Sequence, residues 1–232
     1  SELSIGQSLN EGEVRLQVDK FALTANNITY GITGDLLGYW RFFPVQENIV
    51  TSNENKWGRL PVMGFADVVA SNHHDIKVGE RVWGFFPMGN VLTINAGKIS
   101  ASGFSDISDH RKGLSPVYSR IERVASNPFY QQNTEDYQML LKGLYTTSWL
   151  IDDFMYDNDY FGAEQYIITS ASSKTSMALA FAIKERGERR SIGLTSKHRV
   201  EFVKSLGLYD QVLSYDDVLS LDSNVATISA DM

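Results

Sequence analysis

The last third of the chain alternates short apolar strands with helices, and this order constrains the fold more than any other feature of the sequence. Four strands are predicted, at Gln165–Thr169, Ser191–Thr195, Val212–Leu213 and Val225–Ser229. The segment Met177–Ile183 is apolar on every side, which is typical of a helix packed onto a sheet. Val200, Val203 and Leu206 mark one face of a second helix, and Gly207 stands where a left-handed residue ends it. Strands and helices alternating at this spacing predict parallel βαβ units.

The first two thirds of the chain form strands separated by glycine and loop residues. Val14, Leu16 and Val18 alternate with polar residues, which is the period-two pattern of a half-buried strand. Two further strands, rich in β-branched and aromatic residues, are predicted at Val62–Ala70 and Arg81–Phe86, with a tight turn at 77–80 before the second. This region is therefore predicted to be a β-rich domain.

A long helix is predicted between these two regions. Thr134 followed by Glu135 and Asp136 is typical of a helix start, because a hydroxyl caps backbone amides and carboxylates favour the positive end of the helix dipole. We expect the helix to continue, with a break near Gly143, to about Tyr156.

The composition excludes several classes of protein. The formal net charge is -7 and there is no block of lysine or arginine, which argues against nucleic acid as a partner. No run approaches the roughly 18 apolar residues of a membrane span, and no export signal is recognisable, so we expect a cytoplasmic protein with no membrane partner. The chain has no cysteine, which excludes disulfides, thiolate nucleophiles and cysteine-ligated zinc.

Several segments occur in an order and at a spacing that resemble a known superfamily. They are Glu13–Val18, Leu23–Asn27, Leu60–Ala66, Val78–Val82 and Tyr145–Ser148. With these segments the chain resembles the medium-chain dehydrogenase/reductase superfamily, and in particular its zinc-free, quinone-oxidoreductase-like branches. The resemblance implies an α/β protein with a GroES-like β-rich domain over residues 1–132, a helical linker over 133–162 and a Rossmann-type parallel-sheet domain over 163–232. It also implies a substrate cleft between the two domains.

The number of predicted strands leads to an expectation about the nucleotide-binding domain. A full dinucleotide-binding fold has six strands in the order 3-2-1-4-5-6. Four are predicted here before the sequence stops at Met232. We therefore expect a partial, truncated Rossmann domain in which the fourth strand is an open edge.

The residues at the superfamily's zinc-binding positions differ from its pattern. Phe65 and Ala66 stand in place of a histidine and a glutamate, and no cysteine is present to complete the site. A catalytic zinc site needs three protein ligands with nitrogen, sulfur or oxygen donors. We therefore expect no bound metal.

The resemblance places a phosphate-binding turn between the first strand and the first helix of the parallel sheet. Ser170, Ser173 and Ser176 occupy the positions of the superfamily's three glycines. The turn must still allow the backbone to approach a pyrophosphate, and amides at a helix N-terminus attract anions whatever the side chains. The predicted cofactor contacts in this turn are Ser170, Ser172, Ser173, Lys174, Thr175 and Ser176. The alternative is a polar loop that only caps a buried helix.

The residues after the second strand indicate which dinucleotide binds. A carboxylate at this position holds the ribose of NAD, but the chain has none there. Ser196, Lys197 and Arg199 could instead bind a 2′-phosphate, and Tyr215 lies where NADP-selective relatives place a tyrosine. We therefore predict NADP(H) as the cofactor. The alternative is a solvated basic helix start, which the helix dipole disfavours.

The active-site loop implied by the resemblance carries the candidate catalytic residues. Tyr30 is the first choice for a proton donor, with Thr24 and Asn27 as hydrogen-bond partners. The alternative is that these are packing residues. Three other polar clusters are interpreted as structural: His110-Arg111 with Tyr118 as a surface loop, His73-His74-Asp75 as a hairpin turn, and Asp152-Asp153 as a solvated helix face.

Two functions are compatible with these residues. The first is an NADP(H)-dependent oxidoreductase that reduces a carbonyl, a quinone or an activated alkene without zinc. The second is a non-catalytic NADP-binding protein, with a sensor or structural role, that has a degenerate glycine motif. The expected partner is a small-molecule substrate of unknown identity. A homodimer is compatible with this interpretation when the full-length chain is present.

Overall fold

The computed structural model describes residues 8–45 and 58–232. The chain folds as two compact units, the first ending at Leu140 and the second running from Leu141 to Met232. The boundary falls inside helix α2 (Glu135–Asp157), so the helix expected as a linker contributes residues to both units. None of the helices in the described ranges is long and apolar enough to cross a bilayer.

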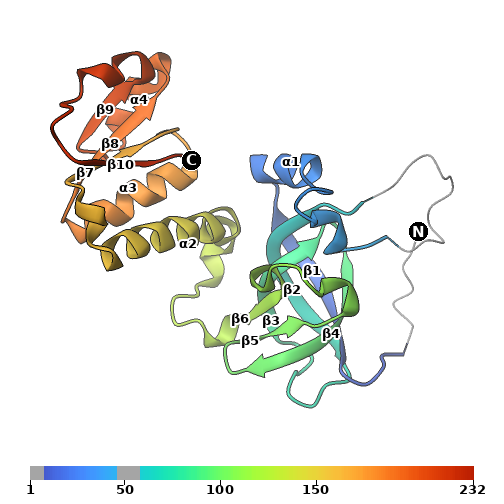
Figure 1. The fold of residues 1–232 in the computed structure, drawn as a ribbon. Coiled ribbons are helices and arrows are strands. Elements are labelled where there is room, and N and C mark those ends of the chain that lie inside the picture. Colours follow the sequence, from blue (N-terminus) through green and yellow to red (C-terminus); the bar gives the residue numbers. More distant parts are fainter. Residues whose placement is uncertain (1–7, 46–57) are drawn as a thin grey trace. The chain divides into compact units, whose positions relative to one another are not determined.

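Six strands of the first unit close into a barrel among the described residues (Figure 1). They are β1 (Glu13–Ala22), β2 (Pro61–Ser71), β3 (Arg81–Pro87), β4 (Val91–Ser100), β5 (Gly103–Asp106) and β6 (Arg120–Arg123). Their order is β1-β2-β3-β6-β5-β4, and β1 pairs with β4 to close the barrel. Every neighbouring pair is antiparallel. The predicted β-rich domain is confirmed.

The barrel is held together by the alternating apolar residues of its strands. Val14 and Leu16 on β1 are fully buried, as their period-two pattern predicts. They pack in one core with Val68, Val82 and Phe104 from three other strands. The short helix α1 (Ala25–Ile32) follows β1 directly, so the segment that the resemblance implied to be a loop is helical.

The second unit contains a four-stranded parallel sheet among its described residues (Figure 1). Its strands are β7 (Gln165–Ile168), β8 (Arg190–Thr195), β9 (Gln211–Ser214) and β10 (Thr227–Ala230). The order β10-β7-β8-β9 corresponds to 4-1-2-3 within this unit, which matches the first four strands of the dinucleotide-binding order. All four predicted strands are confirmed, each within two residues of its expected bounds.

The helices of the second unit lie between the strands as the sequence predicts. They are α3 (Lys174–Arg186) and α4 (Val200–Ser205). Leu179 and Ile183 of α3 pack with Tyr166 and Ile168 of β7 in the core of the unit. Gly207 has a φ of +63°, the left-handed conformation expected for it.

The predicted break in α2 near Gly143 is wrong, because the helix is continuous for 23 residues. A single glycine inside a helix costs only about 1 kcal/mol relative to alanine, which neighbouring interactions can outweigh. One such interaction joins α2 to α3, where the hydroxyl of buried Ser148 donates to the carbonyl of Thr175 at 2.8 Å.

Candidate cofactor and catalytic sites

The carboxyl ends of three parallel strands meet at one edge of the sheet in the second unit. Ile168 of β7 is aligned with Gly193 of β8, and Thr195 of β8 is aligned with Ser214 of β9. This register brings the turn after β7, the segment after β8 and the residue after β9 to the same edge. In open parallel sheets, ligands bind outside the carboxyl ends of the strands. The segments that carry the predicted cofactor contacts therefore begin at this edge.

The turn after β7 is built from serine hydroxyls and backbone groups. Ser173 caps α3, because its Oγ accepts the amide of Ser176 at 3.1 Å. The amide of Ser173 donates to the carbonyl of Ser170 at 2.7 Å, which closes the turn. Ser170 has a φ of +48°, in the left-handed region that glycine adopts most readily. The serine that replaces a glycine thus keeps a glycine-like backbone.

Two tyrosines on either side of β9 bind the peptide groups of this turn. The Tyr209 hydroxyl donates to the carbonyl of Ala171 at 2.9 Å, and burial raises the pKa of Tyr209. The Tyr215 hydroxyl accepts the amide of Ser170 at 2.8 Å. Gly193 on β8 makes room for this arrangement, since a Cβ there would lie 2.9 Å from the Ala171 Cβ and from the Tyr209 ring.

The predicted cofactor contacts in the turn differ in their exposure. Ser170, Ser172, Ser173 and Thr175 are partly exposed, and Lys174 is exposed. Ser176 is 0% exposed, and its hydroxyl donates to the carbonyl of Thr169 at 2.8 Å. The prediction that Ser176 contacts the cofactor is therefore wrong. Its side chain joins α3 to the end of β7 and cannot reach a phosphate.

The basic segment after β8 lies at the surface. Lys197 and Arg199 are exposed, and Ser196 is partly exposed. The side chain of Ser196 pairs with Nε2 of His198 at 3.4 Å. The guanidinium of Arg199 lies 5.9 Å from the ring centre of Phe202. The charged ends of Lys197 and Arg199 thus have access to a ligand at this edge of the sheet.

The first unit holds Tyr30 in a cluster of aromatic rings. The Tyr30 ring lies 4.5 Å from that of Tyr39 and 5.8 Å from that of Phe85, measured between ring centres. Tyr118 lies 6.1 Å from Tyr39. Burial raises the pKa of Tyr30, and burial together with a hydrogen bond to Tyr118 raises the pKa of Tyr39. These phenols therefore remain protonated at neutral pH.

Thr24 and Asn27 are engaged in holding α1 in place. The Oδ1 of buried Asn27 accepts the amide of Thr24 at 2.6 Å and its hydroxyl at 3.3 Å. The Nδ2 of Asn27 donates to the carbonyl of Pro61 at 2.8 Å, which ties α1 to β2. The structure supports the alternative in which these two residues have a structural role, whereas Tyr30 is partly exposed.

The prediction that Arg111 lies in a surface loop is wrong, because its side chain is buried in an ion pair. Its Nε lies 3.0 Å from Oδ2 of Asp106, and both side chains are buried. The guanidinium lies 5.0 Å from the ring centre of Phe42 and 4.6 Å from that of Phe43. The sequence pattern missed this ion pair because neither residue lies in a periodic segment.

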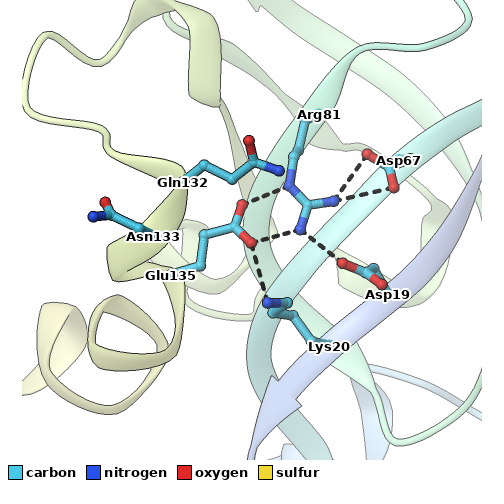
Figure 2. Close-up of a pocket in the computed structure, with 7 residues that line it drawn as sticks. All are labelled: Asp19, Lys20, Asp67, Arg81, Gln132, Asn133 and Glu135. Carbon is cyan, nitrogen blue, oxygen red and sulfur yellow. Dashed lines mark hydrogen bonds and ion pairs between the residues drawn. The ribbon is translucent and has the colours of Figure 1, made fainter.

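A network of charges around Arg81 surrounds an open pocket of about 850 Å³ in the first unit (Figure 2). Arg81 makes two hydrogen bonds to Glu135, of 2.6 and 2.7 Å. It also contacts Asp67 at 3.1 Å and Asp19 at 2.7 Å. Hydrogen bonds from Arg81 lower the pKa of Glu135 to about 2, against the opposing effect of burial. No periodic pattern in the sequence indicates this network, and the one local signal is the presence of the charged residues Asp67 and Arg81 in the apolar strands β2 and β3.

The remaining polar clusters have different surroundings. His73, His74 and Asp75 lie in the connection between the antiparallel strands β2 and β3, as the expected hairpin turn requires, and one ligand atom from each lies within 4.8 Å of the others. Asp152 is buried and accepts a hydrogen bond from Arg186 at 2.7 Å. The solvated face predicted for Asp152 is therefore wrong.

Phe65 stands at a position where the superfamily has a zinc ligand. It is buried, and the guanidinium of Arg81 lies 5.4 Å from the centre of its ring.

Comparison with solved structures finds three that are similar to this chain at low sequence identity. CurA from Vibrio vulnificus is 13% identical, with a TM-score of 0.51, and the match covers 91% of this chain and 51% of that chain. CurA from Vibrio vulnificus in complex with NADPH is 14% identical, with a TM-score of 0.49 and coverages of 90% and 50%. The yhdH oxidoreductase from Salmonella enterica in complex with NADP is 15% identical, with a TM-score of 0.49 and coverages of 99% and 62%.

These likenesses concern the fold. The match to CurA confirms the expected β-rich domain and Rossmann-type sheet. The chain spans about half the length of the CurA structures. No curated protein matches the chain. Residues 21–232 match the model of a family described as "Protein of unknown function (DUF2855)".

Proposed function

Since the chain belongs to the DUF2855 family, whose description assigns no function, we propose from its sites that it is an NADP(H)-dependent oxidoreductase. The observation that carries the proposal is the carboxyl edge of the parallel sheet. A serine turn, a helix N-terminus and a basic segment lie together there. These are the parts that hold a pyrophosphate and a phosphorylated ribose.

The helix start at this edge fits a pyrophosphate. None of the described residues accepts a hydrogen bond from the amides of Lys174 and Thr175, which open α3. The first amides of a helix have no partner within the helix, so they are donors for an anion. Lys174 is exposed beside them and adds positive charge.

The basic segment favours NADP(H) over NAD(H). Ser196, Lys197 and Arg199 follow β8 and include no carboxylate. A carboxylate there would bind the two ribose hydroxyls of NAD and repel a 2′-phosphate. The exposed ammonium and guanidinium groups would instead pair with the 2′-phosphate.

The chemistry proposed for the chain needs a proton donor and needs no metal. When bound, the nicotinamide cofactor supplies the hydride. The chain's own residues bind the cofactor's phosphates and deliver a proton to the oxygen or carbon of the reduced group. The Tyr30 phenol carries such a proton at neutral pH, as phenols ordinarily do, and burial raises its pKa further. Carbonyls, quinones and activated alkenes are the substrates that this combination serves.

One observation favours the second candidate, a non-catalytic NADP-binding protein. Thr24 and Asn27, which were expected to form hydrogen bonds with Tyr30, instead form hydrogen bonds that hold α1 in place. The Tyr30 hydroxyl therefore lacks the two partners expected for a proton donor. This candidate shares the cofactor site and differs only in turnover. A panel of quinones, enones and aldehydes, with NADPH oxidation as the signal, distinguishes the two.

We expect the chain to bind NADPH more tightly than NADH, because only NADPH offers a 2′-phosphate to Lys197 and Arg199. Replacing both by alanine should narrow the difference by about 1–2 kcal/mol, a roughly five- to thirtyfold change in relative affinity. Fluorescence titration of NADPH and NADH measures both affinities. As a matched control, Arg190→Ala with Lys204→Ala removes the same charge from the same unit and should leave the ratio unchanged. Equal affinities in the unmodified chain would refute the assignment.

We expect Tyr30→Phe to lower turnover about 100-fold or more, the usual contribution of a general acid, with NADPH affinity unchanged. The measurement is NADPH oxidation with the best substrate of the panel. Tyr137→Phe is the control, since Tyr137 is an exposed tyrosine of the same unit. Unchanged turnover in Tyr30→Phe would assign the proton to another group.

A further inference from the structure

Ser170 has a backbone conformation that its side chain disfavours. Its φ of +48° places it in the left-handed region, where a Cβ crowds the following carbonyl oxygen and glycine does not. The conformation must therefore be stabilised by the surroundings of the residue. Ser170 also stands at the first of the three glycine positions of the phosphate turn, so its backbone determines where the rest of the turn lies.

The surroundings of Ser170 hold both of its backbone polar groups. Its amide donates to the Tyr215 hydroxyl at 2.8 Å, and its carbonyl accepts the amide of Ser173 at 2.7 Å. The next residue, Ala171, is held by the carbonyl of Leu194 and by the Tyr209 hydroxyl, each at 2.9 Å. Of these contacts, the one from Tyr215 is the only side-chain contact made directly to the Ser170 backbone among the described residues.

Tyr215 reaches the turn from a distant part of the chain. It follows β9 and lies 45 positions after Ser170 in the sequence. The parallel register of β8 with β9 ends at Thr195 and Ser214, which places Tyr215 at the same edge as the turn. Tyr215 is also 43% exposed, so its phenol is held at the edge and is not part of the core. Its hydroxyl therefore contributes mainly to the stability of the turn and little to the packing of the core.

We propose that Tyr215 is a positioning residue for the dinucleotide: its hydroxyl holds Ser170 in the left-handed conformation that glycine would adopt without help. This inference rests on the proposed function. It assigns Tyr215 a different task from the 2′-phosphate contact that the resemblance implied. A hydroxyl that holds the turn affects the pyrophosphate, which NADPH and NADH share. A hydroxyl that binds the 2′-phosphate affects NADPH alone.

The two tasks give different results for Tyr215→Phe. If Tyr215 positions the turn, the affinities for NADPH and NADH should fall by the same factor, roughly two- to tenfold, the effect of one neutral hydrogen bond. Ser170→Gly should rescue this variant, because glycine adopts a positive φ without the tyrosine. We therefore expect the double variant to bind both dinucleotides within about twofold of the unmodified chain. Tyr145→Phe, which alters a similarly exposed tyrosine of the same unit, should change nothing.

Fluorescence titration of all four proteins with NADPH and NADH tests the inference, together with amide hydrogen exchange of the turn. Tyr215→Phe should speed exchange at residues 169–173, and this readout needs no cofactor. Loss of NADPH affinity alone, or a failure of Ser170→Gly to rescue, would overturn the inference. If neither dinucleotide binds the unmodified chain, the proposed function fails. In that case, faster exchange in Tyr215→Phe would still show that the tyrosine holds the turn, and unchanged exchange would refute this.

Discussion

Replacing Arg81 by methionine should lower the free energy of unfolding of the first unit by about 3 kcal/mol. The substitution leaves Glu135, which is only 2% exposed, without its main partner. Removing one member of a buried ion pair typically costs about 3–5 kcal/mol, because the other charge stays buried. We expect the lower end, since Lys20 remains 3.4 Å from Glu135 and Tyr130 still donates to it at 2.6 Å. Urea unfolding followed by tryptophan fluorescence measures the change.

A double variant separates the loss of a contact from the burial of an unpaired charge. Adding Glu135→Gln to Arg81→Met removes the stranded carboxylate, so most of the lost stability should return, to within about 1 kcal/mol of the unmodified chain. Lys112→Met is the control, because Lys112 and its partner Asp109 are both exposed, and it should leave the unfolding curve in place. An Arg81→Met variant as stable as the unmodified chain would show that the network does not stabilise the barrel.

The second large effect is a loss of stability in acid. The pKa of Glu135 is about 2 in the folded chain, against an ordinary value of 4.5. A carboxyl whose pKa is lowered by folding stabilises the folded state above its unfolded pKa, and this contribution disappears as the pH falls through the folded pKa. The contribution of Glu135 is therefore complete above about pH 4.5 and lost by about pH 2. A difference of this size corresponds to at most about 3 kcal/mol.

The share of Glu135 in this acid effect can be isolated. Other carboxylates also titrate in the same range, so unfolding free energies should be measured from pH 6 to pH 2 for both the unmodified chain and Glu135→Gln. We expect the difference between the two to shrink steadily below pH 4.5. A difference that stays constant over this range would contradict the lowered pKa of Glu135.

Local patterns in the sequence were enough to predict most of the fold. Strands β1, β2 and β3 of the first unit and all four strands of the second unit lie within or close to predicted ranges, whereas no ranges were predicted for β4, β5 and β6. The strand-helix alternation from Gln165 onwards also predicted a parallel sheet, which the structure contains. These features depend on periodicity and on residues at turns, such as Gly207, and such signals act over a few neighbouring positions.

The tertiary structure decided what the candidate site residues do. The sequence alone identified the serine turn, the basic segment and Tyr30 as polar groups at places where a superfamily binds its ligands. It could not show that the side-chain amide of Asn27 would form its hydrogen bonds with Thr24 and Pro61, or that Ser176 would be buried. Whether a side chain faces a ligand or the interior depends on the packing of separate elements against one another.

The contacts that carry the strongest predictions join residues far apart in the chain. Arg81 meets Glu135 from 54 positions away, and Ser170 meets Tyr215 from 45 positions away. No periodic pattern connects such residues, because the first contact joins barrel strand β3 to the start of α2 and the second depends on the register of parallel strands. The sequence by itself therefore determined most of the elements and their order, whereas the tertiary structure alone determined which polar groups hold one another and which remain for a ligand.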